Sequence, residues 1–600
     1  MQEDFVTRGS PAAPFVCLRN QAARVWNLFG TPDRVVCCRT LEAVLPCLAE
    51  VERATQSEGF HAAGFVAYEA APAFDPALPA KEDPDFPLLW FALYPAPPAE
   101  LDQLPDRQPG AGQPDNSLDE MPVWRLPFTE EAYLERVKTV LEYIRRGDTY
   151  QVNLTHRLRA STSVRNPWPF FCALAAEPAP PYGGFVDIGD WVACSASPEQ
   201  FFKLDGNAIE SRPMKGTIGR GRWFEQDEAR AAELRASEKD RAENLMIVDM
   251  VRNDLGRIAH PGTVVVPRLF DVERYPTVWQ MTSTVTAETD ASLVDIFRAL
   301  FPPASITGAP KRRTMQIIDE LESTPRRIYT GAIGWIAPRR QAQFSVAIRT
   351  PLFQRRTGTA EYGVGGGIVW DSKPAAEARE CRVKTRVLHH RPPPFELLET
   401  LRWTVEAGYD LEDLHLQRLA NSAQYFEFHF ERTVVAEQLH RFAETLGISP
   451  ARVRLTMNRS GECRIEARAL PESGGGFQQL SVARAPIDPA NVFLYHKTTH
   501  RAVYRQAVAQ CPGAGDVLLF NDRGEVTEST IANLALEIDG TWFTPPVECG
   551  LLPGTMRRHL LENGTLVERI LTVDEVLARG EVLLFNSVRG LQKAGIFVRT

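Results

Sequence analysis

Two pairs of acidic residues share the same spacing and could hold a cation together. Asp240 and Glu243 lie three residues apart in a predicted helix that Ser237 can cap. Glu377 and Glu380 repeat this spacing in a later predicted helix. Like charges so spaced repel by about 0.2–0.5 kcal/mol, and a divalent cation between the helices would turn that cost into binding. Oxygen ligands of this kind suit Mg²⁺. The alternative is two solvated helix faces.

A single lysine lies among residues that shape a loop. Lys215 follows Pro213 and precedes Gly216 and Gly219, shortly after the apolar run 201–204. This order predicts a strand that runs into a tight loop, where the backbone can approach a ligand and one amine can be aimed at it. Taken alone, the pattern is more typical of a surface lysine in a turn.

Two further features could bind an anion. Gly365, Gly366 and Gly367 interrupt the predicted strand 362–370, and glycine can expose backbone N–H groups to a ligand. Arg349 closes another predicted strand and could grip a carboxylate with two nitrogens. The sequence has neither GxGxxG before a helix nor a GK[ST] loop. Together these features predict a small polyanionic ligand that is not a phosphate.

Helices and strands must place these groups. A helix is predicted after Thr129, which can cap it, and it should end at Gly147. Residues 148–155 predict a turn that enters a strand. Residues 96–122 are rich in Pro, Asp, Gln and Gly, which predicts a long loop or a partly disordered connector.

Length and composition exclude several classes. The 600 residues are too many for one core and predict two or three domains. The net charge of -9 argues against a nucleic-acid partner, because no basic face would neutralise phosphates. The chain has no apolar run of 18 residues and no signal-like start, so we expect neither a membrane span nor secretion. Ten scattered Cys without a CxxC pair fit free thiols in a cytoplasmic protein.

The last third of the chain carries a second candidate lysine. Residues 390–394 include three prolines and predict a short stiff linker. Beyond it, Lys497 stands after a predicted strand, and another predicted strand ends at Gly554 before a helix. The start of that helix would offer free amides to a phosphate. A lone lysine of this kind is most often a surface residue.

The order of the motifs is more informative than any one of them. Residues 125–388 resemble the chorismate-utilising enzymes, in particular the aminodeoxychorismate synthase component I family. Seven segments carry the resemblance: GDTYQVNLT (147–155), SPEQF (197–201), ESRPMKGT (210–217), AENLMIVDMVRNDLGRI (242–258), PPASITGAPK (302–311), FSVAIRT (344–350) and GGGIVWDSKPAAEARE (365–380).

This resemblance implies roles for the candidate residues. The four acids of the two predicted helices would hold Mg²⁺, which would neutralise the ring carboxylate of chorismate. Arg349, Lys384 and the amides of Gly365, Gly366 and Gly367 would bind carboxylates, with Thr307 close by. Glu199 matches a general acid or base that helps the C4 hydroxyl to leave.

Lys215 distinguishes between members of this group. Related anthranilate synthases resemble PIAGT here, with alanine at the lysine position. The resemblance implies that Lys215 attacks C2 and forms a covalent adduct, after which ammonia enters at C4. Many relatives carry His where this chain has Gln280, and an amide cannot shuttle a proton near neutral pH. If that His aromatises anthranilate, its loss favours a non-aromatic amine as product.

Residues 395–600 resemble the fold-type IV pyridoxal-phosphate (PLP) enzymes, which include branched-chain and D-amino acid aminotransferases and aminodeoxychorismate lyase. The likeness implies that Lys497 forms a Schiff base with PLP, that Arg418 pairs with the phosphate and that Glu528 keeps the pyridine nitrogen protonated. Thr400 would assist the lyase chemistry. Four backbone amides would complete the phosphate site: those of Ile531, Ala532, Thr555 and Met556.

The two resemblances together predict a bifunctional enzyme of 4-aminobenzoate synthesis for folate. Chorismate and ammonia would give 4-amino-4-deoxychorismate, and PLP-dependent elimination of pyruvate would follow. One alternative is an anthranilate or isochorismate-type synthase fused to a branched-chain or D-amino acid transaminase, and another is a non-catalytic interaction protein. No Cys lies in a GxCxG setting, so we expect a separate glutamine amidotransferase to deliver ammonia.

The expected fold class is α/β and α+β, with four parts along the chain. Residues 1–122 form the N-terminal part of the chorismate module, 123–389 its catalytic domain, 390–394 the linker and 395–600 the PLP domain. The first module should pair two facing sheets with outer helices, and the second should have two α/β lobes. Fold-type IV enzymes are usually dimers, so we expect a homodimer through the PLP domain.

Overall fold

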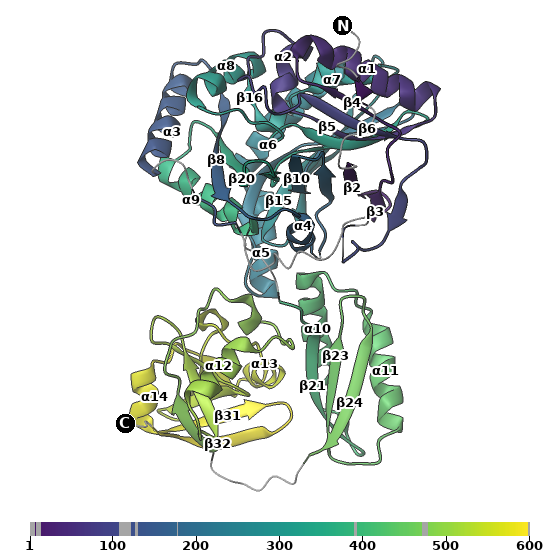
Figure 1. The fold of residues 1–600 in the computed structure, drawn as a ribbon. Helices are drawn as coiled ribbons and strands as arrows, with labels where there is room; N and C mark the ends of the chain where they lie inside the picture. Colours follow the sequence, from purple (N-terminus) through teal and green to yellow (C-terminus); the bar gives the residue numbers. More distant parts are fainter. Residues whose placement is uncertain are drawn as a thin grey trace. The chain divides into compact units, whose positions relative to one another are not determined.

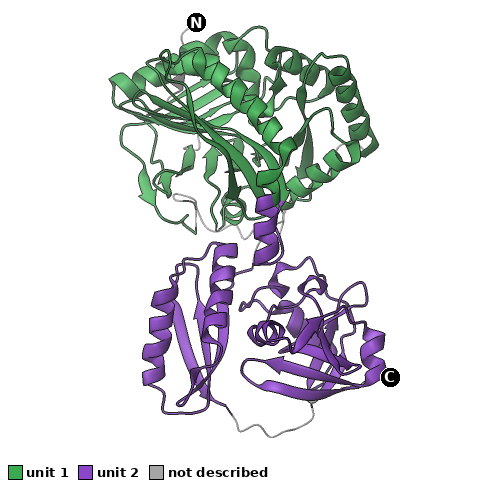
Figure 2. Ribbon diagram, turned by 180° about the vertical axis from the view of Figure 1, so that it is seen from behind, with its two compact units in different colours: residues 1–218, 233–391 green, residues 219–232, 392–600 purple. Residues whose placement is uncertain are grey.

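The structure of this chain, a computed structural model, divides into two compact units. Unit 1 comprises Met1–Ile218 and Glu233–Arg391, and unit 2 comprises Gly219–Ala232 and Pro392–Thr600 (Figure 2). The described residues are 6–7, 14–106, 108, 122–125, 130–176, 178–388, 393–470 and 478–597. The predicted cap Thr129 and most of the predicted linker lie outside them. No helix in these ranges is long and apolar enough to cross a membrane.

The first sheet of unit 1 has 11 strands within the described residues. In spatial order they are β1 (Val6–Thr7), β4 (Arg34–Cys38), β6 (Leu89–Tyr94), β5 (His61–Val66), β17 (Ala332–Ala337), β18 (Gln341–Val346), β11 (Gln200–Asp205), β12 (Ala208–Arg212), β15 (Val278–Glu288) and β13 (Met214–Gly219), with β14 (Val265–Arg274) beside β15. The strand that carries Lys215 is therefore at the end of this order.

The second sheet of unit 1 has nine strands in the part of the chain that is described. Their order is β16 (Gly308–Ala309), β8 (Gln151–Ser161), β20 (Thr359–Ile368), β19 (Pro351–Gln354), β10 (Trp191–Ser197), β9 (Tyr182–Asp187), β2 (Phe15–Asn20), β3 (Val25–Leu28) and β7 (Ala99–Leu101). Strand β7 lies within 96–122, so the prediction of a loop throughout that segment is wrong. Three residues there extend the sheet by pairing with β3.

Helices cover the outer faces of both sheets, as predicted (Figure 1). They are α1 (Leu41–Ser57), α2 (Ala71–Phe74), α3 (Glu130–Arg145), α4 (Trp168–Leu174), α6 (Glu238–Gly256), α7 (Leu293–Leu300), α8 (Lys311–Leu321) and α9 (Pro374–Thr385). Ile247 of α6 and Phe297 of α7 share a core cluster with Phe202 of the first sheet. Val137 of α3 shares another with Leu154 of the second sheet.

A third cluster lies between the two sheets. Phe65 and Trp90 from the first sheet are buried with Leu18 and Val186 from the second. Side chains alternate across a strand, so each sheet presents one apolar face to its partner and another to the helices. The resulting layers are helix, sheet, sheet and helix.

Unit 2 contains two lobes, each a sheet with helices. The four-stranded sheet has the order β22 (Gly408–Tyr409), β21 (Leu397–Thr404), β23 (Ala451–Met457) and β24 (Cys463–Ala469), with α10 (Glu412–Phe426) and α11 (Arg432–Glu444). The eight-stranded sheet has the order β27 (Val526–Ser529), β26 (Asp516–Phe520), β25 (Gln478–Val482), β32 (Gly590–Phe597), β31 (Glu581–Asn586), β28 (Asn533–Ile538), β29 (Thr541–Thr544) and β30 (Leu566–Glu568). Its helices are α12 (Ala502–Gln510), α13 (Thr555–Glu562) and α14 (Val573–Arg579).

Three local predictions differ from the structure. Lys215 lies within strand β13 rather than in a tight loop, because β15 pairs along that segment. Lys497 follows a 3-10 turn, Val492–Leu494, and not a strand. Gly554 is preceded by a second 3-10 turn, Val547–Cys549, and irregular backbone before α13 begins. At the last two positions an apolar run did not distinguish a strand from a buried turn.

Candidate active sites

The site in unit 1 is built around an irregular strand. Gly216, directly after Lys215, has a φ of +96°, and a Cβ there would lie 2.9 Å from the Cβ of Asp240. Only glycine adopts this backbone readily, and its missing side chain lets α6 approach the strand. Ser237 caps α6 as predicted, since its hydroxyl accepts the N–H of Asp240. The strand and the first acid pair are thereby held together.

The amine of Lys215 lies against the glycine run of β20. Its Nζ is 3.9 Å from Oε2 of Glu243. A Cβ added to Gly367 would be 2.2 Å from that Nζ and 3.1 Å from Nε2 of Gln151. The glycine therefore leaves the space that the amine occupies, which is a different role from the predicted anion contact.

The glycine run forms one continuous strand with its neighbours. Gly365, Gly366 and Gly367 pair with Thr155, Leu154 and Asn153 of β8. Strand β19 pairs only with Thr359–Tyr362 on the other edge of β20. The predicted interruption of the strand is therefore wrong. Because β19 ends there, one edge of the glycine run is without a paired strand in the described residues.

The second acid pair lies over the same glycines. Oε2 of Glu377 and Oε1 of Glu380 are 3.3 and 3.9 Å from the Cβ position of Gly366. Burial raises the pKa of both Glu377 and Glu243. The negative charges of Asp240 and Glu380 raise the pKa of Glu243 further. Two helices thus bring their acids into one region, and the shared Mg²⁺ site stays a prediction.

The acids offer oxygen donors that suit Mg²⁺ but do not form a ready cage. No group of three or more His, Cys, Asp or Glu among the described residues is arranged to hold a metal. Glu380 is instead paired with Lys384 at 2.8 Å, and this lysine lowers the pKa of Glu380. The donor chemistry and mutual repulsion of the acids fit a cation, and Glu380 would have to exchange its partner to bind one.

Glu199 has the properties of a proton donor near neutral pH. It is 4% exposed, and its Oε1 accepts a hydrogen bond of 2.6 Å from the hydroxyl of Ser305. Burial raises the pKa of Glu199 to about 7. A carboxyl in this range can both give and take a proton at physiological pH.

The predicted carboxylate-binding residues differ in whether their side chains already have hydrogen-bond or ion-pair partners. Arg349 has a φ of +51° between β18 and β19, and no hydrogen bond or ion pair engages its guanidinium in the described part of the chain. Lys384 donates to the carbonyl of Gly365 at 2.8 Å besides its pair with Glu380. The hydroxyl of Thr307 is fully buried and donates to the carbonyls of Pro303 and Ala304. Arg349 is therefore the residue most available to a substrate anion.

Gln151 is a candidate that the sequence analysis missed. Its side chain is fully buried, and neither the nitrogen nor the oxygen of its carboxamide has a hydrogen-bond partner within the described ranges. It lies beside the Lys215 amine, so it can offer a donor and an acceptor to a ligand there. Its place next to an apolar strand residue in QVNL gave no signal of this role.

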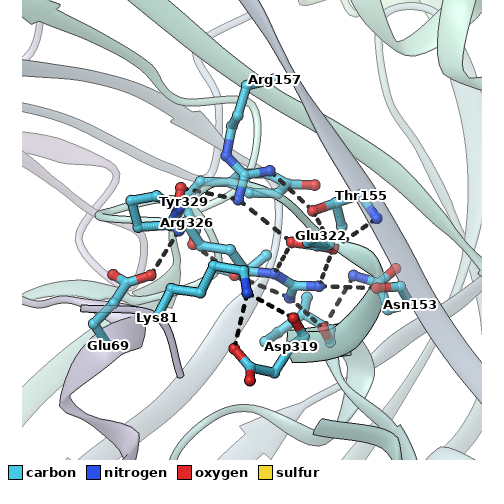
Figure 3. Close-up of polar contacts among 12 residues, drawn as sticks. Glu69, Lys81, Asn153, Thr155, Arg157, Asp319, Glu322, Arg326 and Tyr329 are labelled. Carbon is cyan, nitrogen blue, oxygen red and sulfur yellow. Dashed lines mark hydrogen bonds and ion pairs between the residues drawn. The ribbon is translucent and has the colours of Figure 1, made fainter. Parts of the chain in front are cut away.

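A buried ionic network supports the strand that carries Gln151 (Figure 3). Arg326, 1% exposed, donates to both carboxylate oxygens of Glu322 at 3.0 and 2.7 Å. Its Nη1 donates to the carbonyl of Ile306 at 3.1 Å, and Nη2, which also binds Glu322, donates to the carbonyl of Asn153 at 2.9 Å. The network thus joins β8 to the turn that contains Thr307. Neither residue lies within α8, which ends at Leu321, so no helical pattern in the sequence marked this pair.

In unit 2 Lys497 lies beside strand β21. Its carbonyl accepts the N–H of Leu398 at 2.9 Å, and Thr400 lies two residues further on the same face of that strand. Burial lowers the pKa of Lys497 to about 8, and the positive charge of Arg418 adds to the effect. The structure therefore brings the charges of Lys497 and Arg418 into one region, and the role of Thr400 stays a prediction.

Arg418 is held by a glutamate that the sequence analysis did not identify. Its Nε and Nη2 donate to the two oxygens of Glu399 at 2.9 and 2.6 Å. Nδ1 of His415 is 2.7 Å from the same carboxylate. Burial opposes ionisation of Glu399, but Arg418 and His415 outweigh it and hold the pKa of Glu399 at about 2. This bidentate pair orients the guanidinium.

Glu528 is buried between two donors. The hydroxyl of Tyr504 donates to its Oε1 at 2.7 Å, and the amide of Asn533 donates to its Oε2 at 3.1 Å. Burial raises the pKa of Glu528 to about 7. A carboxyl of this kind can share a proton with a heteroaromatic nitrogen, which fits the predicted contact with PLP.

The four predicted phosphate-binding amides fall into two groups. Those of Ile531 and Ala532 already donate to the hydroxyl of Ser529, at 3.3 and 3.0 Å. Thr555 and Met556 begin α13, whose first turn has no side-chain cap, so these amides suit an anion. The free helix start, the oriented Arg418 and the buried lysine together fit PLP.

Comparison with known proteins identifies both parts. Residues 13–390 match the chorismate binding enzyme family, and residues 396–594 match amino-transferase class IV. The first match covers more than half of the chain, so the chain belongs to the chorismate binding enzyme family. Its second part is a class IV aminotransferase domain, for which PLP is the implied cofactor.

Individual proteins to which the chain is similar include two synthase components and one solved structure. Aminodeoxychorismate synthase component 1 of Klebsiella aerogenes is 40% identical over 316 residues, which are 52% of this chain and 66% of that protein. The Escherichia coli protein of the same name is 43% identical over 259 residues, 43% of this chain and 56% of that one. Anthranilate synthase component I from Streptococcus pneumoniae shares the fold, with 26% identity, a TM-score of 0.51 and coverage of 65% of this chain and 95% of that chain. The matches thus leave part of each curated relative uncovered.

Proposed function

We propose that this chain makes 4-aminobenzoate for folate synthesis in two steps. Unit 1 would convert chorismate and ammonia into 4-amino-4-deoxychorismate, and unit 2 would eliminate pyruvate from that intermediate. The observation that carries the proposal is the placement of the Lys215 amine over Gly367 and 3.9 Å from Glu243, on the same chain as a class IV domain. A related synthase with alanine at this position would lack the nucleophile.

The first step needs a nucleophile and a proton donor. Lys215 would form a bond to C2 of chorismate while the C4–O bond breaks, and Glu199 would donate the proton with which water leaves. Ammonia would then bond to C4 as the bond from C2 to Lys215 breaks, and the new ammonium group would return a proton to Glu199. A pKa of about 7 for Glu199 supports both transfers.

Substrate binding in this step would use opposite charges. Arg349, Lys384 and the amides of Gly365, Gly366 and Gly367 are proposed to bind the carboxylates of chorismate. The free guanidinium of Arg349 supports this assignment best. We further propose that four acids hold Mg²⁺, which supplies positive charge opposite the ring carboxylate: Asp240, Glu243, Glu377 and Glu380.

The second step would use the residues around Lys497. PLP, when bound, supplies an electron sink for the carbon that bears the amine. Arg418 and the amides of Ile531, Ala532, Thr555 and Met556 would hold its phosphate, and Glu528 would face its ring nitrogen. Lys497 would remove the proton from C4 while the C3–O bond breaks, and Thr400 would assist. The lowered pKa of Lys497, about 8, supports its use as a base.

Three further parts of the proposal concern the partners and the location of the chain. A separate glutamine amidotransferase would supply ammonia, which is supported by relatives that are named as components of a synthase. The chain would act in the cytoplasm. Unit 2 would mediate a homodimer, as is usual for fold-type IV enzymes.

The proposal is tested by product analysis. The purified chain is supplied with chorismate, ammonium and Mg²⁺, with and without PLP, and the products are identified by mass spectrometry. We expect a non-aromatic amine without PLP and 4-aminobenzoate with it, and neither from Lys215→Ala. Anthranilate as the main product, or full activity of Lys215→Ala, would refute the assignment.

The ammonia source is tested separately. Glutamine in place of ammonium should give no product with the pure chain, because no Cys lies in a GxCxG setting. Turnover with glutamine alone would contradict the need for a partner.

A further inference from the structure

Side chains from two other elements donate to the carbonyl groups of Lys215 and Gly216. Nδ2 of Asn244, on α6, donates to the carbonyl of Lys215 at 3.1 Å. Nε2 of Gln280, on β15, donates to the carbonyl of Gly216 at 2.9 Å. Two carboxamides from different elements therefore bind two consecutive carbonyls.

Gln280 makes a second contact with the same strand. Its Oε1 accepts a hydrogen bond of 2.8 Å from the hydroxyl of Thr217. One carboxamide thus spans Gly216 and Thr217 and uses both its donor and its acceptor. This contact compensates for the irregular backbone at Gly216, whose φ of +96° departs from that of a regular strand.

Both carboxamides are themselves held in place. Asn244 is 1% exposed, and its Oδ1 accepts from the hydroxyl of Ser283 at 2.6 Å. The backbone N–H of Ser283 donates to the carbonyl of Pro213 at 3.2 Å. Gln280 pairs with Glu273 of β14 through the sheet. The Asn244 carboxamide is therefore bound at both its oxygen and its nitrogen, and the sheet fixes the backbone from which the Gln280 carboxamide extends.

We propose that Asn244 and Gln280 form a carboxamide clamp that aims the Lys215 amine at the acids and Gly367. Fixing the peptide planes on the C-terminal side of Lys215 sets the direction of its Cα–Cβ bond. The proposal rests on the proposed role of Lys215 as nucleophile. Both residues are positioning residues, because neither is assigned a contact with substrate. A misplacement of about 1 Å can reduce a rate about 100-fold.

The chemistry of the clamp explains why position 280 carries an amide. A glutamate there would keep the shape but place a carboxylate oxygen against the carbonyl of Gly216, where a donor is needed. A histidine carries its two nitrogens at fixed places on a rigid ring and cannot follow two adjacent groups as a carboxamide does. The exchange of His for Gln280 therefore does more than remove a possible base, because it supplies a carboxamide that binds the strand.

The test compares matched amide-to-acid variants of the full chain. Gln280→Glu and Asn244→Asp remove one donor each, and Gln316→Glu and Asn253→Asp make the same changes at exposed positions of α8 and α6. We expect kcat for amination to fall about 10- to 100-fold in the first pair, with KM for chorismate within about twofold. The exposed variants should keep wild-type values.

A second readout does not depend on turnover. Labelling by an amine-reactive reagent, followed by peptide mass spectrometry, reports how accessible Lys215 is relative to Lys239, whose side chain is 56% exposed. The clamp predicts a changed labelling rate at Lys215 and an unchanged rate at Lys239. If the wild-type chain does not aminate chorismate, the proposed function fails, and the labelling comparison still decides whether the clamp exists.

Two results would overturn the clamp. One is a pair of clamp variants whose kcat and Lys215 labelling both match the wild type. The other is a rise in KM with unchanged kcat, which would indicate a direct substrate contact. Should Gln280→Glu fail to fold, Thr217→Val is the substitute, because it removes only the exposed hydroxyl that donates to Oε1 of Gln280. This variant should also lower kcat, by a smaller factor. Gln280→His should lose amination without gaining anthranilate synthesis.

Discussion

Single atoms decide where the reactive groups of unit 1 can lie. At Gly366 and Gly367 the missing Cβ leaves room for a carboxylate of Glu377 and for the Lys215 amine. At Gly365 the same addition would meet the backbone of Leu154 at 2.3 Å. Three neighbouring glycines thus have different reasons to be glycine. Their substitution should have different effects.

Gly367→Ala should disable amination while the fold persists. The added methyl group would lie 2.2 Å from Nζ of Lys215, and that flexible end can move, so folding is retained while the amine is displaced. We expect kcat to fall about 10- to 100-fold with an unchanged circular dichroism spectrum. Gly256→Ala, where nothing lies within 4 Å, is the matched control. Normal amination by Gly367→Ala would show that the amine works from another position.

Glu199 should give amination its pH dependence. With its pKa at about 7, the protonated acid predominates below that pH, so the rate limited by loss of the C4 hydroxyl should fall as pH rises through about 7. Glu199→Gln should lower kcat about 10²- to 10⁴-fold and remove this limb of the profile. The exposed Glu135→Gln should leave it in place. A profile unchanged in Glu199→Gln would assign the proton to another group.

Elements cooperate through the buried network of Arg326 and Glu322. The pair joins the end of α8 to β8 and to the turn before β16, so three segments distant in sequence share one set of charges (Figure 3). The backbone N–H and the hydroxyl of Thr155 both donate to Glu322, at 2.9 and 2.7 Å. Saturated partners of this kind make a buried ion pair costly to break from one side.

Arg326→Met should destabilise unit 1. The variant leaves the carboxylate of Glu322 buried, with Arg157 at 3.7 Å as its remaining cation among the described residues. We expect a loss of about 3–5 kcal/mol in the free energy of unfolding, measured by urea titration. Arg252→Met on the exposed face of α6 should change it by less than about 0.5 kcal/mol. A loss equally small in Arg326→Met would mean that water or a rearranged Arg157 replaces the guanidinium.

At the scale of the whole molecule, the two units carry separate cores and separate candidate sites. Residues of the clusters in unit 1 do not recur in those around β21 and β28. Lys215 and Lys497 therefore depend on different sets of packed elements. A ligand that binds one unit should therefore stabilise that unit and leave the stability of the other unchanged.

PLP should stabilise one of two unfolding transitions. In calorimetry of the full chain, PLP at about 100 times its Kd should stabilise unit 2 by about 2.7 kcal/mol and leave the transition of unit 1 in place. Lys497→Ala should reduce this shift, because the covalent link to the cofactor is lost. An equal shift of both transitions would show that the units unfold together.

Helical segments and the grouping of acids followed from the sequence. The periodic pattern ending near Gly147 became α3, the Ser237 cap began α6, and the two acid pairs reached one region. The helix and its cap depend on contacts between residues three or four apart, which a sequence displays directly, whereas the meeting of the two acid pairs was implied by the family resemblance. The two lysines and their motifs were likewise visible because each lies in a distinctive run of residues.

Contacts between distant segments were decided only by the tertiary structure. Lys215 lies in a strand because β15 pairs with β13, and Gly367 is required because an amine from another sheet occupies its Cβ position. Glu399, Gln151 and the Arg326 pair gained their roles from burial beside groups more than 15 residues away. Burial and pairing across such distances depend on how the sheets close over each other, and no local pattern of residue types records that.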